Sequence, residues 1–134
     1  MHQRITLGLT LLAGVAIGAT AIQALHAQAK PPIYYISEID VSNPEAYGKE
    51  YAPQAQAIIK AAGGRFVAIG GTGGVGAGKV TAFDGELPKR VTVQVWDSME
   101  KIKAWRADPA YIALRKIGDK YAKYNSYAVD GVPQ

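Results

Sequence analysis

The pattern of apolar and polar positions from residue 33 onward predicts four strands and two interrupted helices. Runs rich in β-branched and aromatic residues favour extended backbone and therefore predict the strands. These runs cover residues 33–41, 65–69, 90–96 and 124–130. Between them, apolar residues recur at spacings of three and four, which is the period of a helix with one buried face.

Local signals mark where the helical segments begin, break and end. Asn43 and Pro44 open the first segment, because Asn can accept free backbone N–H groups and Pro suits the first helical turn. Pro53 lies inside this segment and predicts a break near Tyr51. The second segment follows residues 97–98 and is interrupted at Asp108, which precedes a proline that restarts it.

The resulting order, β-α-β-β-α-β, is that of the α+β ferredoxin-like sandwich with an antiparallel sheet. Its helices cover one face of the sheet, and a second copy could bury the other face, as in a dimeric α+β barrel.

Alternation along residues 90–96 divides that strand into two faces. We assign Val91, Val93 and Val95 to the helix side, so that Thr92, Gln94 and Trp96 would share the open face. Tyr34 of the first strand would join them. The predicted dimer interface therefore contains Tyr34, Gln94 and Trp96.

Residues 1–29 have the features of a signal peptide. Arg4 precedes an apolar run over residues 5–24, and the small-residue triplet Ala27-Gln28-Ala29 fits a cleavage site. We expect cleavage after Ala29, a single domain over residues 30–134, and a periplasmic or secreted product. An uncleaved anchor is the alternative, because the run is long enough to span a bilayer. If the signal peptide is cleaved, the protein contacts the membrane only before cleavage, through that segment.

Composition then limits the chemistry of the mature chain. The sequence has no cysteine, and its two histidines, His2 and His26, both lie in the leader. Zinc or copper sites built on imidazole or thiolate, cysteine nucleophiles and Ser-His-Asp triads are therefore excluded. We expect no metal and no cofactor, and export argues against a nucleic-acid partner despite the net charge of +4.

A glycine-rich stretch over residues 70–79 imitates two nucleotide-binding motifs. Gly73, Gly78 and Lys79 match the phosphate-loop spacing, but Val80 stands where that motif needs a hydroxyl. No helix is predicted behind the glycines, although a phosphate site needs a helix N-terminus. We interpret the stretch as a hairpin connection that binds neither ATP nor NAD, and its length leaves a flap over a pocket possible.

Several short segments together resemble the bacterial family called domain of unknown function 1330. They are residues 43–47 (NPEAY), 61–66 (AAGGRF), 88–91 (PKRV), 97–105 (DSMEKIKAW) and 108–111 (DPAY). The resemblance implies a dimeric α+β barrel and no particular reaction. Many members of the family carry Glu where this chain has Val95. Related barrels include cofactor-free oxygenases and isomerases, so catalysis follows only by analogy.

The candidate ligand site lies between the helices and the sheet. Tyr51, Trp105 and Tyr111 lie on the apolar helix stripes, and Arg65 could hold a carboxylate at the pocket mouth. Glu38 and Asp40 share one face of their strand and could transfer protons if buried.

We expect a homodimer that binds a small aromatic or amphipathic molecule, with no catalytic residue assigned. The alternatives are a cofactor-independent enzyme like an oxygenase or isomerase, and a structural dimer with a closed core. A pocket with convergent polar groups would favour the first two over the third.

Overall fold

The computed structural model describes residues 30–74 and 77–134, and the predicted signal peptide lies outside them. Four strands form one antiparallel sheet in the order β2-β3-β1-β4. They are β1 (Ile33–Val41), β2 (Arg65–Gly71), β3 (Arg90–Trp96) and β4 (Ala122–Asp130). The predicted α+β class and the predicted strand order along the chain are confirmed.

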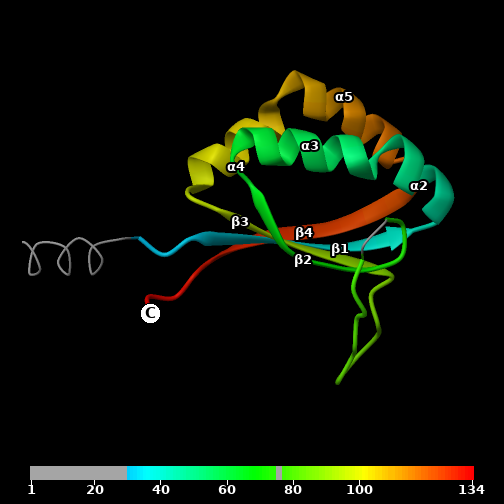
Figure 1. Ribbon diagram of the computed structural model, residues 1–134, viewed down its shortest axis with the longest axis horizontal. Coiled ribbons are helices and arrows are strands. Elements are labelled where there is room, and N and C mark those ends of the chain that lie inside the picture. Colours follow the sequence, from blue (N-terminus) through cyan, green and yellow to red (C-terminus); the bar gives the residue numbers. More distant parts are fainter. Residues whose placement is uncertain (1–29, 75–76) are drawn as a thin grey trace, which may run out of the picture. The chain divides into compact units, whose positions relative to one another are not determined.

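Helices α2 (Pro44–Glu50), α3 (Ala52–Ala62), α4 (Met99–Ala107) and α5 (Pro109–Gly118) cover one face of this sheet (Figure 1). The Asn43 side chain accepts a hydrogen bond from the Ala46 N–H at the start of α2. Tyr51 separates α2 from α3, and Asp108 separates α4 from α5, as the two prolines predicted. Within the described residues, no helix is long and apolar enough to cross a membrane.

The structure reverses the predicted facing of β3. Arg90, Thr92, Gln94 and Trp96 are buried, whereas Val91, Val93 and Val95 are only partly buried. Trp96 is 1% exposed and stacks on Trp105 of α4, with 5.3 Å between ring centroids. Gln94 and Trp96 therefore lie beneath the helices, and their assignment to the open face is wrong.

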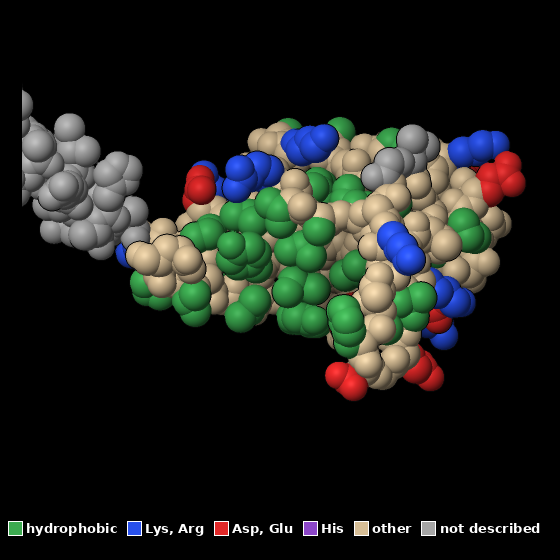
Figure 2. Space-filling view, turned by 60° about the horizontal axis from the view of Figure 1, so that its bottom comes forward, with side chains coloured by type: hydrophobic (Ala, Val, Ile, Leu, Met, Phe, Trp, Pro, Cys, Tyr) green, Lys and Arg blue, Asp and Glu red, His purple; other side chains and the backbone are tan. Residues whose placement is uncertain are grey.

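The outer sheet face is apolar over its central part, and the polar residues Arg65, Glu38 and Asn125 lie on the same face. Tyr34 lies on it as predicted, because the register places Tyr34 opposite Val95 and Val129. We call the apolar part of this surface the valine face. It consists of Tyr34, Ile36, Ala68, Val91, Val93, Val95, Tyr127 and Val129. Figure 2 shows hydrophobic side chains gathered on this side of the molecule. No described helix covers them.

The glycine-rich stretch leaves the sheet at the end of β2. The Gly71 N–H donates to the Gly78 carbonyl at 3.0 Å, and the Gly78 N–H donates to the Ile69 carbonyl at 2.7 Å. Residues 75–76 of this stretch lie outside the described residues. Residues 77–89 contain no helix and project away from the helix layer, with Phe83 92% exposed (Figure 1). Among the described residues the helix that a phosphate loop requires is therefore missing.

Candidate functional site

A cavity of about 40 Å³ lies between the sheet and the helices. We call it the helix–sheet cavity. Its floor is polar and is formed by side chains from β1, β3 and β4: Ser37, Arg90, Thr92, Gln94 and Ser126. A sheet face covered by helices is ordinarily apolar, because it forms the core. A polar floor in this position is therefore unusual.

Short hydrogen bonds hold much of the floor in place. The hydroxyl oxygens of Ser37 and Ser126 lie 2.7 Å apart on neighbouring strands. Gln94 Oε1 accepts a hydrogen bond from Trp96 Nε1 at 2.8 Å, which satisfies the buried indole N–H. These contacts involve three of the five floor residues, Ser37, Ser126 and Gln94.

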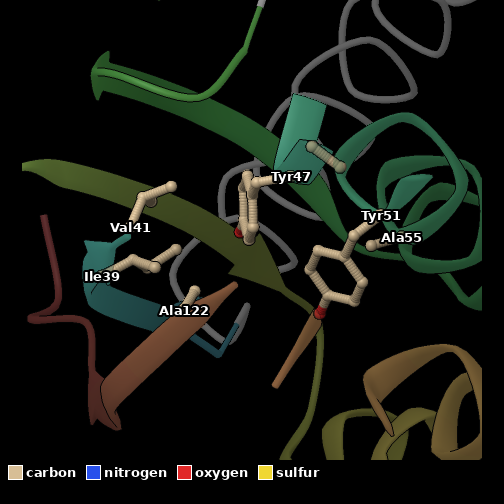
Figure 3. Packing of buried hydrophobic residues seen from close by; sticks show 7 residues of the cluster. Ile39, Val41, Tyr47, Tyr51, Ala55 and Ala122 are labelled. Carbon is tan, nitrogen blue, oxygen red and sulfur yellow. The ribbon is translucent and has the colours of Figure 1, made fainter. Parts of the chain in front are cut away.

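Tyrosines form the walls of the cavity. Tyr47 and Tyr51 come from α2 and the break that follows it, and their ring centroids are 5.2 Å apart (Figure 3). Across the cavity, the Tyr51 and Tyr111 hydroxyl oxygens lie 3.2 Å apart. Burial raises the pKa of Tyr47, Tyr51 and Tyr124 above the ordinary value. These phenols are therefore neutral hydrogen-bonding groups at physiological pH.

Arg90 is the buried cation of the site. It is 2% exposed, and its Nη1 donates to the Thr72 carbonyl at 3.2 Å. Its Cζ lies 5.6 Å from the centre of the Tyr47 ring. A Cβ atom at Gly74 would lie 2.8 Å from Nη1, so the glycine-rich stretch packs closely against the guanidinium.

Three buried polar side-chain atoms of the described residues have no hydrogen-bond partner. They are Arg90 Nε, Trp105 Nε1 and the Tyr124 hydroxyl oxygen. All three residues line the helix–sheet cavity. Buried polar groups are nearly always paired, so this concentration indicates that water or a ligand completes the site.

Three of the four predicted ligand residues meet in this cavity, namely Tyr51, Trp105 and Tyr111. Arg65 does not, because it is exposed and pairs with Val95 on the outer sheet face. Its predicted place at the pocket mouth is wrong. The arginines that line the cavity are Arg90 and Arg115. Arg90 was not among the predicted site residues because the two faces of its strand were assigned the wrong way round.

The predicted proton-transfer pair lies elsewhere. Glu38 and Asp40 both point to the outer face of β1, away from the helix–sheet cavity. Asp40 is exposed and forms an ion pair with Lys89 at 2.8 Å, which lowers the pKa of the Asp40 carboxyl. A deprotonated, exposed carboxylate of this kind does not meet the condition of burial on which the prediction depended.

Within the described part of the chain, no group of acidic, histidine or cysteine side chains could hold a metal ion. The polar groups that line the cavity are hydroxyls, the two amides of Gln56 and Gln94, and the guanidiniums of Arg90 and Arg115. Chemically, this set can donate hydrogen bonds and offer positive charge.

Comparison with known protein families shows which family the chain matches. Residues 32–132 match the family model described as a domain of unknown function, DUF1330. The chain belongs to the DUF1330 family. The resemblance seen in its short sequence segments is thereby confirmed. No curated protein matches this DUF1330 chain by sequence.

Solved structures share the fold of this DUF1330 protein at low sequence identity. SnoaB, a cofactor-independent oxygenase from Streptomyces nogalater, matches with a TM-score of 0.56 and 11% identity over 78% of this chain and 96% of that one. A protein of unknown function from Rhodopseudomonas palustris matches with a TM-score of 0.52 and 14% identity over 85% of this chain and 94% of that one. Both likenesses identify the α+β barrel fold.

Proposed function

We propose that this DUF1330 protein is a homodimer in which each protomer binds a small molecule in the helix–sheet cavity. The polar floor of the cavity is the observation that carries the proposal. Thr92 and Gln94 are buried beneath the helices, whereas the valines between them face outward. Burying polar side chains in place of valines is unfavourable unless they acquire partners. Among the described residues, Arg90 and Trp105 of this cavity still have a buried polar atom without a partner, which supports a bound molecule.

The outward valines support the second half of the proposal. The valine face has residues on all four strands, and an apolar surface of this kind on a small protein usually meets another surface. A second copy of the same chain would bury it symmetrically. The polar residues of β3 thus face a ligand inside the protomer, and its valines face a partner outside it.

The cavity chemistry favours binding over catalysis. SnoaB is a cofactor-independent oxygenase, and its similar fold is what supports an enzyme as the alternative. Proton abstraction from a substrate needs a base whose pKa lies near the working pH. No carboxylate lines the helix–sheet cavity, and burial keeps the phenols of Tyr47 and Tyr51 protonated. The described residues therefore supply donors and positive charge, and no evident base.

Native mass spectrometry of the protein purified from the cells that naturally make it tests this proposal. We expect a dimer mass with a small molecule retained in each protomer. In Gln94→Leu, the floor loses its amide and the retained molecule should be lost while the dimer mass persists. A wild-type dimer that carries no small molecule would contradict ligand binding, and a monomer would contradict the homodimer.

We also propose that the protein is exported and that the mature chain begins at Lys30. The basic residue, the apolar run and the triplet Ala27-Gln28-Ala29 support this proposal. Mass spectrometry of the protein in the periplasmic fraction tests it. An intact Met1 in the membrane fraction would instead support a retained anchor.

A further inference from the structure

We infer that the ligand of the helix–sheet cavity carries a carboxylate group, which the guanidinium of Arg90 binds. This inference rests on the proposed function of the cavity and adds the chemical class of the ligand. It depends on three properties of the site, which are its charge, its free donors and its size.

The charge of the site is unbalanced. Arg90 is 2% exposed, and no carboxylate is among the residues that line the cavity. The other cavity arginine, Arg115, already has a partner, because its Nε donates to Asp119 Oδ1 at 2.9 Å. None of the ion pairs formed by described residues includes Arg90. Buried charges in proteins are ordinarily paired, so an anion is the expected missing partner.

The contacts that Arg90 does make leave this need unmet. The Thr72 carbonyl accepts one hydrogen bond from Nη1, and the face of the Tyr47 ring lies 5.6 Å from Cζ. Neither group carries a negative charge, because burial keeps the Tyr47 phenol protonated. A neutral carbonyl and a ring face stabilise a guanidinium less than a paired carboxylate does.

The unpaired donor of Arg90 belongs to a group that can bind a carboxylate through two hydrogen bonds. Arg90 Nε has no partner among the described residues. In a guanidinium, the Nε–H and the adjacent Nη2 form one edge, and this edge matches the two oxygens of a carboxylate. The unpaired Trp105 Nε1 is a further donor on the wall of the same cavity.

The size of the cavity suits a small anionic group. Its volume of about 40 Å³ holds roughly three water molecules. A carboxylate group has three non-hydrogen atoms, whereas a phosphate group has five. The carboxylate could belong to a small aliphatic acid that fits entirely, or to an aromatic acid whose ring displaces wall residues.

Matched pairs of probes test the inference on the wild-type protein. Sodium acetate and sodium benzoate are compared with acetamide and benzamide, which have similar shapes and no charge, at an ionic strength fixed with sodium chloride. Fluorescence of the two tryptophans reports binding, because Trp105 lines the cavity. We expect at least one carboxylate to bind about tenfold more tightly than its amide. Tighter binding of acetate indicates a small aliphatic acid, and tighter binding of benzoate indicates an aromatic one.

Variants assign the effect to Arg90. Arg90→Met should weaken carboxylate binding about tenfold and remove the preference over the amide. Arg90→Lys keeps the positive charge but lacks the paired N–H groups of the guanidinium, so it should lose part of the carboxylate binding. This variant keeps the inference testable if Arg90→Met does not fold. Lys60→Met removes an exposed positive charge from α3 and should leave binding unchanged.

The outcomes also separate this inference from the proposed function. Equal binding of amide and carboxylate, or unchanged carboxylate binding in a folded Arg90→Met, would overturn the carboxylate inference and leave the binding site in place. A neutral molecule retained in native mass spectrometry would do the same. If neither carboxylate binds and no molecule is retained, both proposals are overturned.

Discussion

At the residue scale, aromatic side chains from the sheet and from α4 and α5 form the part of the core beside the cavity. Trp105 stacks on Trp96, its ring centroid lies 4.7 Å from that of Tyr111, and it meets Tyr35 edge-on at 5.1 Å. Because Trp105 also lines the helix–sheet cavity, these rings fix one wall of the site. Stability and site geometry therefore depend on the same residues.

Replacing Trp96 tests this part of the core. Trp96 is 1% exposed, so Trp96→Ala removes a fully buried indole and leaves a void against Trp105. We expect the free energy of unfolding to fall by about 3–5 kcal/mol in urea denaturation. The exposed Lys103→Ala on α4 should change it by less than about 0.5 kcal/mol. A similarly small effect of Trp96→Ala would contradict the burial of this side chain.

The buried phenols predict how stability changes at alkaline pH. Burial raises the pKa of Tyr47, Tyr51 and Tyr124, so the folded state favours their neutral forms. This contribution is complete below the unfolded pKa of about 10 and is lost as the pH rises above it. We expect ionisation of these tyrosines, followed by absorbance at 295 nm, to coincide with loss of helical circular dichroism. Complete tyrosine ionisation near the unfolded pKa in a protein that keeps its helices would refute this.

At the scale of elements, Asp108 joins two helices. Its N–H donates to the Trp105 carbonyl at the end of α4, at 3.1 Å, and its carboxylate accepts from the Ala110 N–H at the start of α5, at 2.9 Å. Asp108→Ala removes the cap and should cost about 1 kcal/mol of unfolding free energy. Asp108→Asn keeps an acceptor and should cost less in the same urea experiment. Equal losses in both variants would argue against the cap.

The same scale explains what the sequence could predict. The breaks at Tyr51 and Asp108 depend on prolines and caps within a few residues, so local rules locate them. Alternation in β3 separates two faces but does not say which face the helices cover. The valines were assigned to the helix-covered face because they are hydrophobic, whereas the structure buries Arg90 and Gln94 on that face. A cavity and an uncovered outer face are long-range features that no local pattern contains, and Arg65 was chosen over Arg90 for the same reason.

For the whole molecule, the two faces of the sheet have opposite character. The helix-covered face carries the polar floor, and the uncovered face carries the valine face. A protomer alone would expose the valine face to water, as Figure 2 shows. In the proposed homodimer, this face is buried and the helix–sheet cavity stays on the other side of each sheet. Assembly and ligand binding should therefore be separable by mutation.

A charge at the centre of the valine face tests assembly directly. Val93 lies on the central strand β3, opposite Ile36 of β1 and Ala68 of β2. A symmetric interface would receive Val93→Lys from both protomers, and burying two unpaired ammonium groups is strongly unfavourable. We expect sedimentation equilibrium at micromolar concentration to show a dimeric wild type and a monomeric variant.

Two measurements make this result specific. Near-ultraviolet circular dichroism should remain native in Val93→Lys, because Trp96 and Trp105 lie on the helix side of the sheet. Ile112→Lys places the same charge at a residue of α5 that is 47% exposed, and should leave the dimer intact because the helix layer lies on the opposite side from the valine face. A dimeric Val93→Lys, or a monomeric wild type, would show that the valine face does not join two copies of the chain.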